Sequence, residues 1–178
     1  MHDFGWVGNR DACDSNAINY LNDTMASKLR SSIKRILEPA MAELGFRIRY
    51  PHFQRTRNGE LELVSLHHDK WGGGFCLEFA KHAAGDLETS WGELVPEDKI
   101  DVAYTNPATR ARLLARLKHS DGREHFFRYE DIADDRARLD DLVSELVSLL
   151  PQIIEWFETG KAGPNVLPFA EPLRDPAA

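Results

Sequence analysis

The chain has 178 residues, of which 42% are hydrophobic and 29% are charged, an ordinary composition for a globular domain with one hydrophobic core. Its formal net charge of −7 argues against a general nucleic-acid binder, because phosphate contacts need clustered Lys and Arg. No apolar run approaches the ~18 residues of a membrane span, so no membrane partner is expected.

Two cysteines are present, Cys13 and Cys76. Two thiols cannot build a disulfide framework, and the N-terminus lacks the apolar core of a signal peptide. A reducing cytoplasm is therefore the expected location.

Residues 1–24 mix turn formers with isolated apolar residues and are predicted to form an N-terminal extension. From Met25, apolar residues recur at helical spacing as far as Leu44. Pro39 predicts a bend near the last turns of this helix. Gly45 predicts its end, because glycine readily adopts the left-handed conformation that closes many helices.

Three strands are predicted next, within residues 46–82. The pair Asn58-Gly59 is a strong signal for a two-residue type I′ hairpin turn. This turn sets Arg55 opposite Glu62, and such opposite charges favour cross-strand pairing. Pro51 is expected to mark a bulge or an edge in the first of the three strands.

Side chains alternate along a strand, so these strands are predicted to have one core face and one outer face. The predicted core face collects eight apolar side chains: Phe46, Ile48, Tyr50, Leu61, Leu63, Phe75, Leu77 and Phe79. The outer face then carries an apolar strip that includes Phe53, Val64 and Leu66, framed by Arg47 and Arg49. Such a strip needs a cover. A segment of the same chain is the favoured cover, and a partner protein is the alternative that makes these five residues a docking surface.

Residues 66–74 read LHHDKWGGG and could be a metal site or a hairpin turn. His67 and His68 point to opposite faces and cannot jointly hold an ion. The predicted register brings His52 near His67, so a metal cluster of His52, His67 and Asp69 on the core-side face is conceivable. The spacing matches no zinc motif, and no phosphate-loop sequence follows. A flexible hairpin turn is the favoured interpretation, and no cofactor is predicted.

The second half begins with a predicted long loop, residues 84–108. In residues 109–118, small or apolar side chains largely alternate with basic ones, which suits a strand. The spacing of the leucines in this segment also suits a helix. A Ser-Asp-Gly turn and an aromatic run follow them and favour a second hairpin.

A closing helix is predicted after the acidic stretch of residues 130–135, whose carboxylates suit a helix N-terminus. Its apolar stripe runs from Leu139 to Phe157, with a bend at Pro151. Residues 161–178 are predicted to form a proline-rich, irregular tail.

The segments LEPAMAELGF, YPHFQRTRNGELELVSL, GGGFCLEFAKH and LLPQIIEWF, in this order, resemble the bacterial family known as domain of unknown function 4304. The resemblance covers roughly residues 25–160. It implies an α+β protein with a mostly antiparallel sheet packed by helices, and it implies no established activity.

The expected fold class is α+β: a mostly antiparallel sheet of consecutive hairpins packed by an N-terminal and a C-terminal helix. Residues 25–160 are expected to form a single domain.

No Ser, His and Asp set stands out, and no Gly-x-Ser-x-Gly elbow is present. The sequence therefore favours a non-enzymatic protein-binding module, of the kind that neutralises a partner protein, and its acidic balance suits basic partners. The alternative is a metal-dependent hydrolase that uses His52, His67 and Asp69. The oligomeric state is left open.

Overall fold

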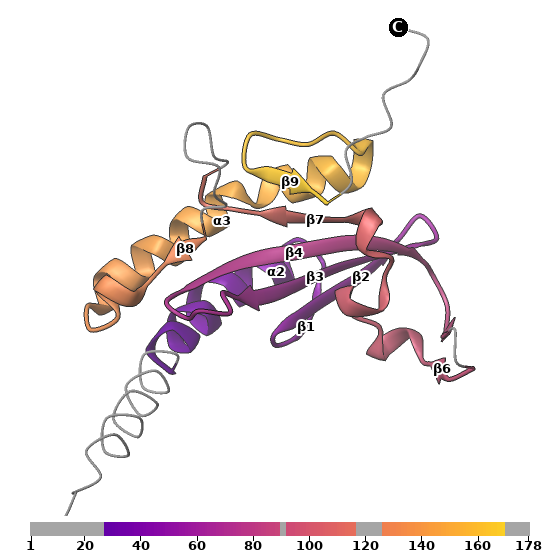
Figure 1. The fold of residues 1–178 in the computed structure, drawn as a ribbon, viewed down its shortest axis with the longest axis horizontal. Coiled ribbons are helices and arrows are strands. Elements are labelled where there is room, and N and C mark those ends of the chain that lie inside the picture. The colour runs from indigo at the N-terminus through magenta and orange to yellow at the C-terminus, as the bar shows by residue number, and fades with distance from the viewer. Residues whose placement is uncertain (1–26, 90–91, 117–125, 170–178) are drawn as a thin grey trace, which may run out of the picture.

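The computed structural model describes residues 27–89, 92–116 and 126–169. The predicted extension at residues 1–24 and the Ser-Asp-Gly turn at residues 120–122 lie outside these ranges. The fold is α+β, as predicted: helices pack against an antiparallel sheet of seven strands (Figure 1).

The sheet is built mainly from consecutive hairpins, with strand order β1-β2-β3-β4-β7-β9 and β8 paired to the end of β4. Its strands are β1 (Arg47–Arg49), β2 (His52–Arg57), β3 (Glu60–His68), β4 (Gly74–Ala83), β7 (Arg110–Leu113), β8 (Phe127–Arg128) and β9 (Val166–Pro168). The first four strands follow one another along the chain, so local contacts dominate this half of the sheet.

The β2–β3 hairpin has the predicted register. Asn58 and Gly59 both have positive φ, of 53° and 79°, which a type I′ turn requires. Arg55 accordingly faces Glu62, and Phe53 faces Val64. The turn residues alone therefore determined the pairing of these two strands.

Pro51 does not sit in a bulge or at an edge of one long strand, and that prediction is wrong. Tyr50 and Pro51, joined by a cis peptide bond, form a turn between two separate strands, β1 and β2. Ile48 consequently pairs with Phe53 and lies on the same face of the sheet.

The N-terminal helix ends where the sequence predicts. It consists of residues 27–32, the π-helical η1 (Ile33–Leu37) and α2 (Glu38–Glu43). The wide π turn lies directly before Pro39, whose ring lacks an N–H and would collide with the carbonyl of Arg35 in a regular helix. At the end, Gly45 has φ 83°, and the Phe46 amide donates to the Met41 carbonyl at 3.0 Å. This is the Schellman pattern of a glycine-terminated helix.

The C-terminal helix α3 (Arg136–Thr159) also has the predicted limits. The Asp135 carboxylate accepts hydrogen bonds from the Ala137 and Arg138 amides, and Gly160 closes the helix with φ 72°. The buried side of α3 consists of Leu139, Val143, Leu146, Leu150, Ile153 and Phe157. These residues follow the 3.6-residue period of the predicted stripe.

The helices cover one face of the sheet, and the main hydrophobic core lies between the helices and this face. Phe53 and Val64 are 1% exposed in this core, and Leu66 is 5% exposed. The predicted docking strip of Phe53, Val64 and Leu66 is therefore wrong, because α3 and the N-terminal helix already bury it. Arg47 and Arg49 are exposed, and strand alternation places them on the opposite face.

The opposite face carries a second, smaller core made of Leu61, Leu63, Ala80, Val95, Ile100 and Val102. Residues 94–105, which we call the cover segment, supply its outer half. The β3–β4 register pairs Val64 with Phe79, so Phe79 shares the helix-covered face with Val64. The predicted core face, which joined Leu61 and Leu63 to Phe79, is wrong. Both faces are buried here.

The predicted long loop contains several short elements. They are β5 (Leu87–Glu88), β6 (Leu94–Val95), η2 (Glu97–Lys99), η3 (Val102–Tyr104) and η4 (Pro107–Thr109). The last three are single turns of 3-10 helix, and β5 pairs with β6.

The strand alternative is correct for the start of residues 109–118, because β7 pairs with β4. β8 pairs with β4 beside β7, and the turn of the predicted second hairpin lies outside the described residues. The short turn η5 (Glu130–Ile132) then leads toward α3.

The sheet also extends past residue 160: β9 pairs with β7, and Val166 is 1% exposed within the main core.

Phe53→Ala should lower the free energy of unfolding by about 3–5 kcal/mol, because it leaves a cavity beneath the helices. Urea denaturation followed by circular dichroism measures this change. The matched control is Phe169→Ala, at a side chain that is 38% exposed, for which we expect a loss below about 1 kcal/mol. Equal losses in the two variants would contradict the burial of Phe53.

Asp140 joins the N-terminal helix to α3 and should make this contact pH-dependent. Its carboxylate accepts hydrogen bonds from Arg35 at 2.5 Å and Ser32 at 2.7 Å, which hold the pKa of Asp140 below its ordinary value. A depressed folded-state pKa stabilises the fold above the unfolded-state pKa of about 3.9, and this contribution is lost as pH falls through the folded-state value. Asp140→Asn should therefore lower the Tm at pH 7, and the gap to the native chain should shrink at pH 2–3.

Thermal melts of the native chain, Asp140→Asn and the control Asp141→Asn across this pH range measure the gap. Asp141 is an exposed neighbour, so its substitution should leave Tm nearly unchanged at both ends of the range. A gap for Asp140→Asn that is the same at pH 3 and pH 7 would contradict the ionic role of this carboxylate.

Candidate functional site

Among the described residues, the cover segment packs over only part of the second face of the sheet. It packs over the row that contains Leu63 and Ala80, and the Glu97 carbonyl accepts a hydrogen bond from Gln54 at 2.5 Å. The next row along the strands is polar and crosses five of them, with each residue directly opposite the next: Arg49, His52, Ser65, Glu78 and Arg112. We call this row, together with His67 on the same face, the open face.

At the edge of the cover segment, three side chains lie in a row, joined by one hydrogen bond and one longer ion-pair contact. Ser65 Oγ lies 2.9 Å from His52 Nδ1, and His52 Nε2 lies 3.7 Å from Asp101 Oδ2. The other oxygen of Asp101 is held by the Ala103 amide at 2.7 Å, which orients the carboxylate. Serine, imidazole and carboxylate in this order have the composition of a hydrolase triad.

The surroundings of Ser65 do not suit acyl transfer. In serine hydrolases the amide after the nucleophile often stabilises the oxyanion. Here that amide belongs to Leu66 and donates to the Pro51 carbonyl at 2.8 Å. Ser65 also lies opposite the Glu78 carboxylate, which disfavours a second negative charge. We therefore interpret the three side chains Ser65, His52 and Asp101 as a latch that holds the cover segment to β2 and β3.

The opposite half of the open face is organised by Glu78. This carboxylate lies 3.3 Å from Arg110 and 3.4 Å from Arg112. Arg110 also donates to the carbonyls of Ala103 and Thr105, so it connects the cover segment to the sheet. The Arg112 guanidinium carbon lies 4.7 Å from the centre of the Phe169 ring.

Beyond His67, the stretch LHHDKWGGG forms the β3–β4 turn, as predicted. The Asp69 amide donates to the Gly74 carbonyl, and the Gly72 amide donates to the Asp69 carbonyl. Gly72 and Gly73 have positive φ, of 81° and 70°, a conformation that glycine adopts without steric penalty.

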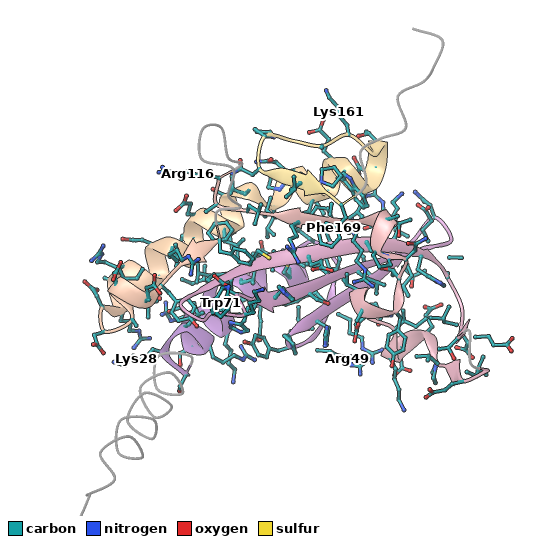
Figure 2. All side chains as sticks on the ribbon, viewed as in Figure 1. Lys28, Arg49, Trp71, Arg116, Lys161 and Phe169 are labelled. Carbon is teal, nitrogen blue, oxygen red and sulfur yellow. The ribbon has the colours of Figure 1, made fainter. Side chains whose placement is uncertain are left out.

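A shallow pocket of about 340 Å³ opens between this turn and the open face. It is lined by His67, Asp69, Lys70, Trp71, Arg112, Phe126 and Arg128, and we call it the turn pocket. Trp71 is 83% exposed at its rim. Figure 2 shows Trp71 beside the turn, Arg49 on β1 and Phe169 after β9.

The charged side chains here are sorted by depth. The Glu78 and Asp69 side chains are each only 9% exposed, and both are bonded to arginines. Arg128, which pairs with Asp69 at 2.7 Å, is 49% exposed, and Arg49 and Lys70 are also exposed. The open face and the turn pocket therefore present cations to solvent, although the chain as a whole is acidic.

The structure separates the predicted metal ligands. His52 and His67 share one face, as expected, but it is the second face and not the helix-covered core side. His52 is engaged by Ser65 and Asp101, while Asp69 is paired with Arg128. Within residues 27–89, 92–116 and 126–169, no group of three His, Cys, Asp or Glu side chains is placed to hold a metal ion.

Several site residues were missed by the sequence reasoning. Ser65, Glu78 and Arg112 carry no motif, and only the pairing of β3, β4 and β7 aligns them. Asp101 comes from the predicted loop. The exposed Trp71 beside three glycines was a usable signal, because an aromatic residue in a glycine-rich turn has few neighbours to bury it.

Comparison with known proteins confirms the family resemblance of the sequence. A family model described as Domain of unknown function (DUF4304) matches residues 37–159, more than half of the chain, so the chain belongs to this family. No curated protein and no solved structure matches it. Among the helices in the described part of the chain, none is long and apolar enough to cross a membrane.

Ser65 should remain unmodified when the chain is incubated with a fluorophosphonate, because the Leu66 amide is engaged by the Pro51 carbonyl and cannot stabilise an oxyanion next to Ser65. Peptide mass spectrometry measures the labelling, with a serine protease in a parallel reaction as the positive control. Labelling of Ser65 that disappears in His52→Ala would show an activated serine and contradict the latch interpretation.

Proposed function

We propose that the protein is a non-enzymatic protein-binding module that docks an acidic segment of another protein on the open face. The observation that carries this proposal is the sorting of charge by depth, with Glu78 and Asp69 turned inward and Arg49, Lys70 and Arg128 turned outward. Complementary charge steers partners together and suppresses wrong ones.

The local charge matters more to a docked partner than the net charge of −7. Exposed charges are screened beyond roughly 10 Å at 0.1 M salt, so a segment on the open face senses mainly the groups beneath it. The expectation of a basic partner, drawn from the whole composition, is therefore replaced by an acidic one.

The residue types at this face also support a protein partner. Tryptophan and arginine are enriched among the side chains that dominate binding energy at protein interfaces. Trp71 and Arg128 line one pocket, and Arg112 lies between that pocket and Phe169. We also infer a bacterial, cytoplasmic setting, supported by the family resemblance and by the buried thiol of Cys76.

The test measures binding of blocked, fluorescently labelled peptides by anisotropy at 50 and 200 mM NaCl. A glutamate-rich peptide should bind, a glutamine-rich peptide of the same length should not, and the higher salt should weaken binding. Reversing two exposed cations, in Arg49→Glu with Lys70→Glu, should weaken binding at least about tenfold.

The matched control is a double reversal, Lys161→Glu with Lys28→Glu, which makes the same change in net charge away from the open face. Lys161 follows α3, and Lys28 lies in the N-terminal helix (Figure 2). The control should bind as the native chain does. Equal binding of the two peptides, or an equal loss in the control, would contradict the proposal.

A further inference from the structure

The turn pocket differs from the rest of the open face because it combines aromatic surface with cations. Trp71 stands at its rim and Phe126 forms part of its wall. Its volume of about 340 Å³ is at the lower end of the range for ligand pockets, roughly 300–1,000 Å³. It can therefore accept one side chain of a partner rather than a large ligand.

Hydrogen bonds of the turn hold the Trp71 backbone in place, and the Trp71 side chain is exposed. The Trp71 amide donates to the Asp69 carboxylate at 3.1 Å, and Arg128 donates to the Gly72 carbonyl at 3.1 Å. The Tyr129 amide donates to the Gly73 carbonyl at 2.9 Å, which ties the turn to the segment before α3. A residue whose backbone is already ordered loses less conformational entropy on binding than a residue of a mobile loop.

The polar groups that face the pocket favour a carboxylate. Asp69 is nearly buried and bonded to both Arg128 and the Trp71 amide, so its charge is already neutralised. The Lys70 ammonium lies 4.9 Å from the centre of the Trp71 ring and stays exposed. Arg128 and Lys70 thus flank the aromatic surface with positive charge.

We propose that the turn pocket receives an aromatic side chain of the partner that is flanked by carboxylates, with the ring against Trp71 and the carboxylates toward Arg128 and Lys70. This inference rests on the proposed function and names the residue types that the docked segment must contain. Aromatic pairs contribute beyond their buried area, and burial of the partner's ring would also cover the exposed Trp71. Single-stranded nucleic acid is the competing ligand, because bases also stack on tryptophan beside cations.

The experiment uses the full chain and three blocked peptides that differ only at the centre: Glu-Phe-Glu, Glu-Ala-Glu and Gln-Phe-Gln. Affinity is measured by anisotropy, and the Trp71 indole N–H is followed by NMR, with Trp71→Phe used to assign it among the four tryptophans of the chain. The Glu-Phe-Glu peptide should bind at least about tenfold tighter than either other peptide. It alone should shift the Trp71 indole signal strongly.

Trp71→Ala should remove the advantage of Glu-Phe-Glu and leave the affinity for Glu-Ala-Glu unchanged. Leu94→Ala is the matched control, because Leu94 is 63% exposed on β6, outside the turn pocket, and its loss should change neither affinity. Thermal melts of both variants should match the native chain, since neither side chain is buried.

The outcomes separate this inference from the proposed function. If neither acidic peptide binds, the proposed function is wrong and the inference falls with it. If Glu-Phe-Glu and Glu-Ala-Glu bind equally well, and Trp71→Ala changes neither, the open face binds acidic segments but the aromatic anchor is wrong. Equal binding of Gln-Phe-Gln and Glu-Phe-Glu would show that the partner's carboxylates do not contribute to binding, which would contradict the inference. Tighter binding of an oligothymidylate than of any peptide would overturn both proposals.

Discussion

The rest of the structure depends on the burial of β4 on both of its faces. Residues 74–80 are buried without interruption, and alternation sends successive side chains to opposite sides of the sheet. A strand of this kind needs a cover on each side. The N-terminal helix and α3 cover the side of Phe75, Leu77 and Phe79. The cover segment covers Ala80 on the other side, and where it ends the open face begins.

On both sides of the sheet, a buried carboxylate is paired with arginine. Under the helices, Glu62 is bonded to Arg55 at 2.5 Å, and Arg55 also donates to the Leu44 carbonyl at the end of the N-terminal helix. On the second face, Glu78 lies against Arg110 and Arg112. A buried charge is stable only when it is paired and hydrogen-bonded, so each inward acid requires an arginine. At the β3–β4 turn this requirement places the exposed Arg128 over the nearly buried Asp69.

Position in the fold, rather than catalytic geometry, therefore characterises the candidate site. The latch of Ser65, His52 and Asp101 marks the border of the cover segment, and the turn pocket marks the far end of the open face. Exposed cations lie at both ends of this face, Arg49 beyond the latch and Lys70 and Arg128 at the turn pocket, where Trp71 is the most exposed apolar side chain. Such a surface recognises charge and aromatic shape together, which is the chemistry of a docking site.

The sequence by itself determined the local elements: the helix ends at Gly45 and Gly160, the β2–β3 register from Asn58-Gly59, and the α+β class with its consecutive hairpins. These follow from backbone conformation and short-range periodicity, which depend on neighbouring residues. The tertiary structure alone decided which face the helices cover. The β2–β3 register already places Phe53 and Leu61 on opposite faces, but only the turn at Pro51 and the pairing of Val64 with Phe79 put Phe53 beneath the helices. The open face arises in the same way, because residues as distant in the sequence as Arg49 and Arg112 are aligned in one row only through strand pairing.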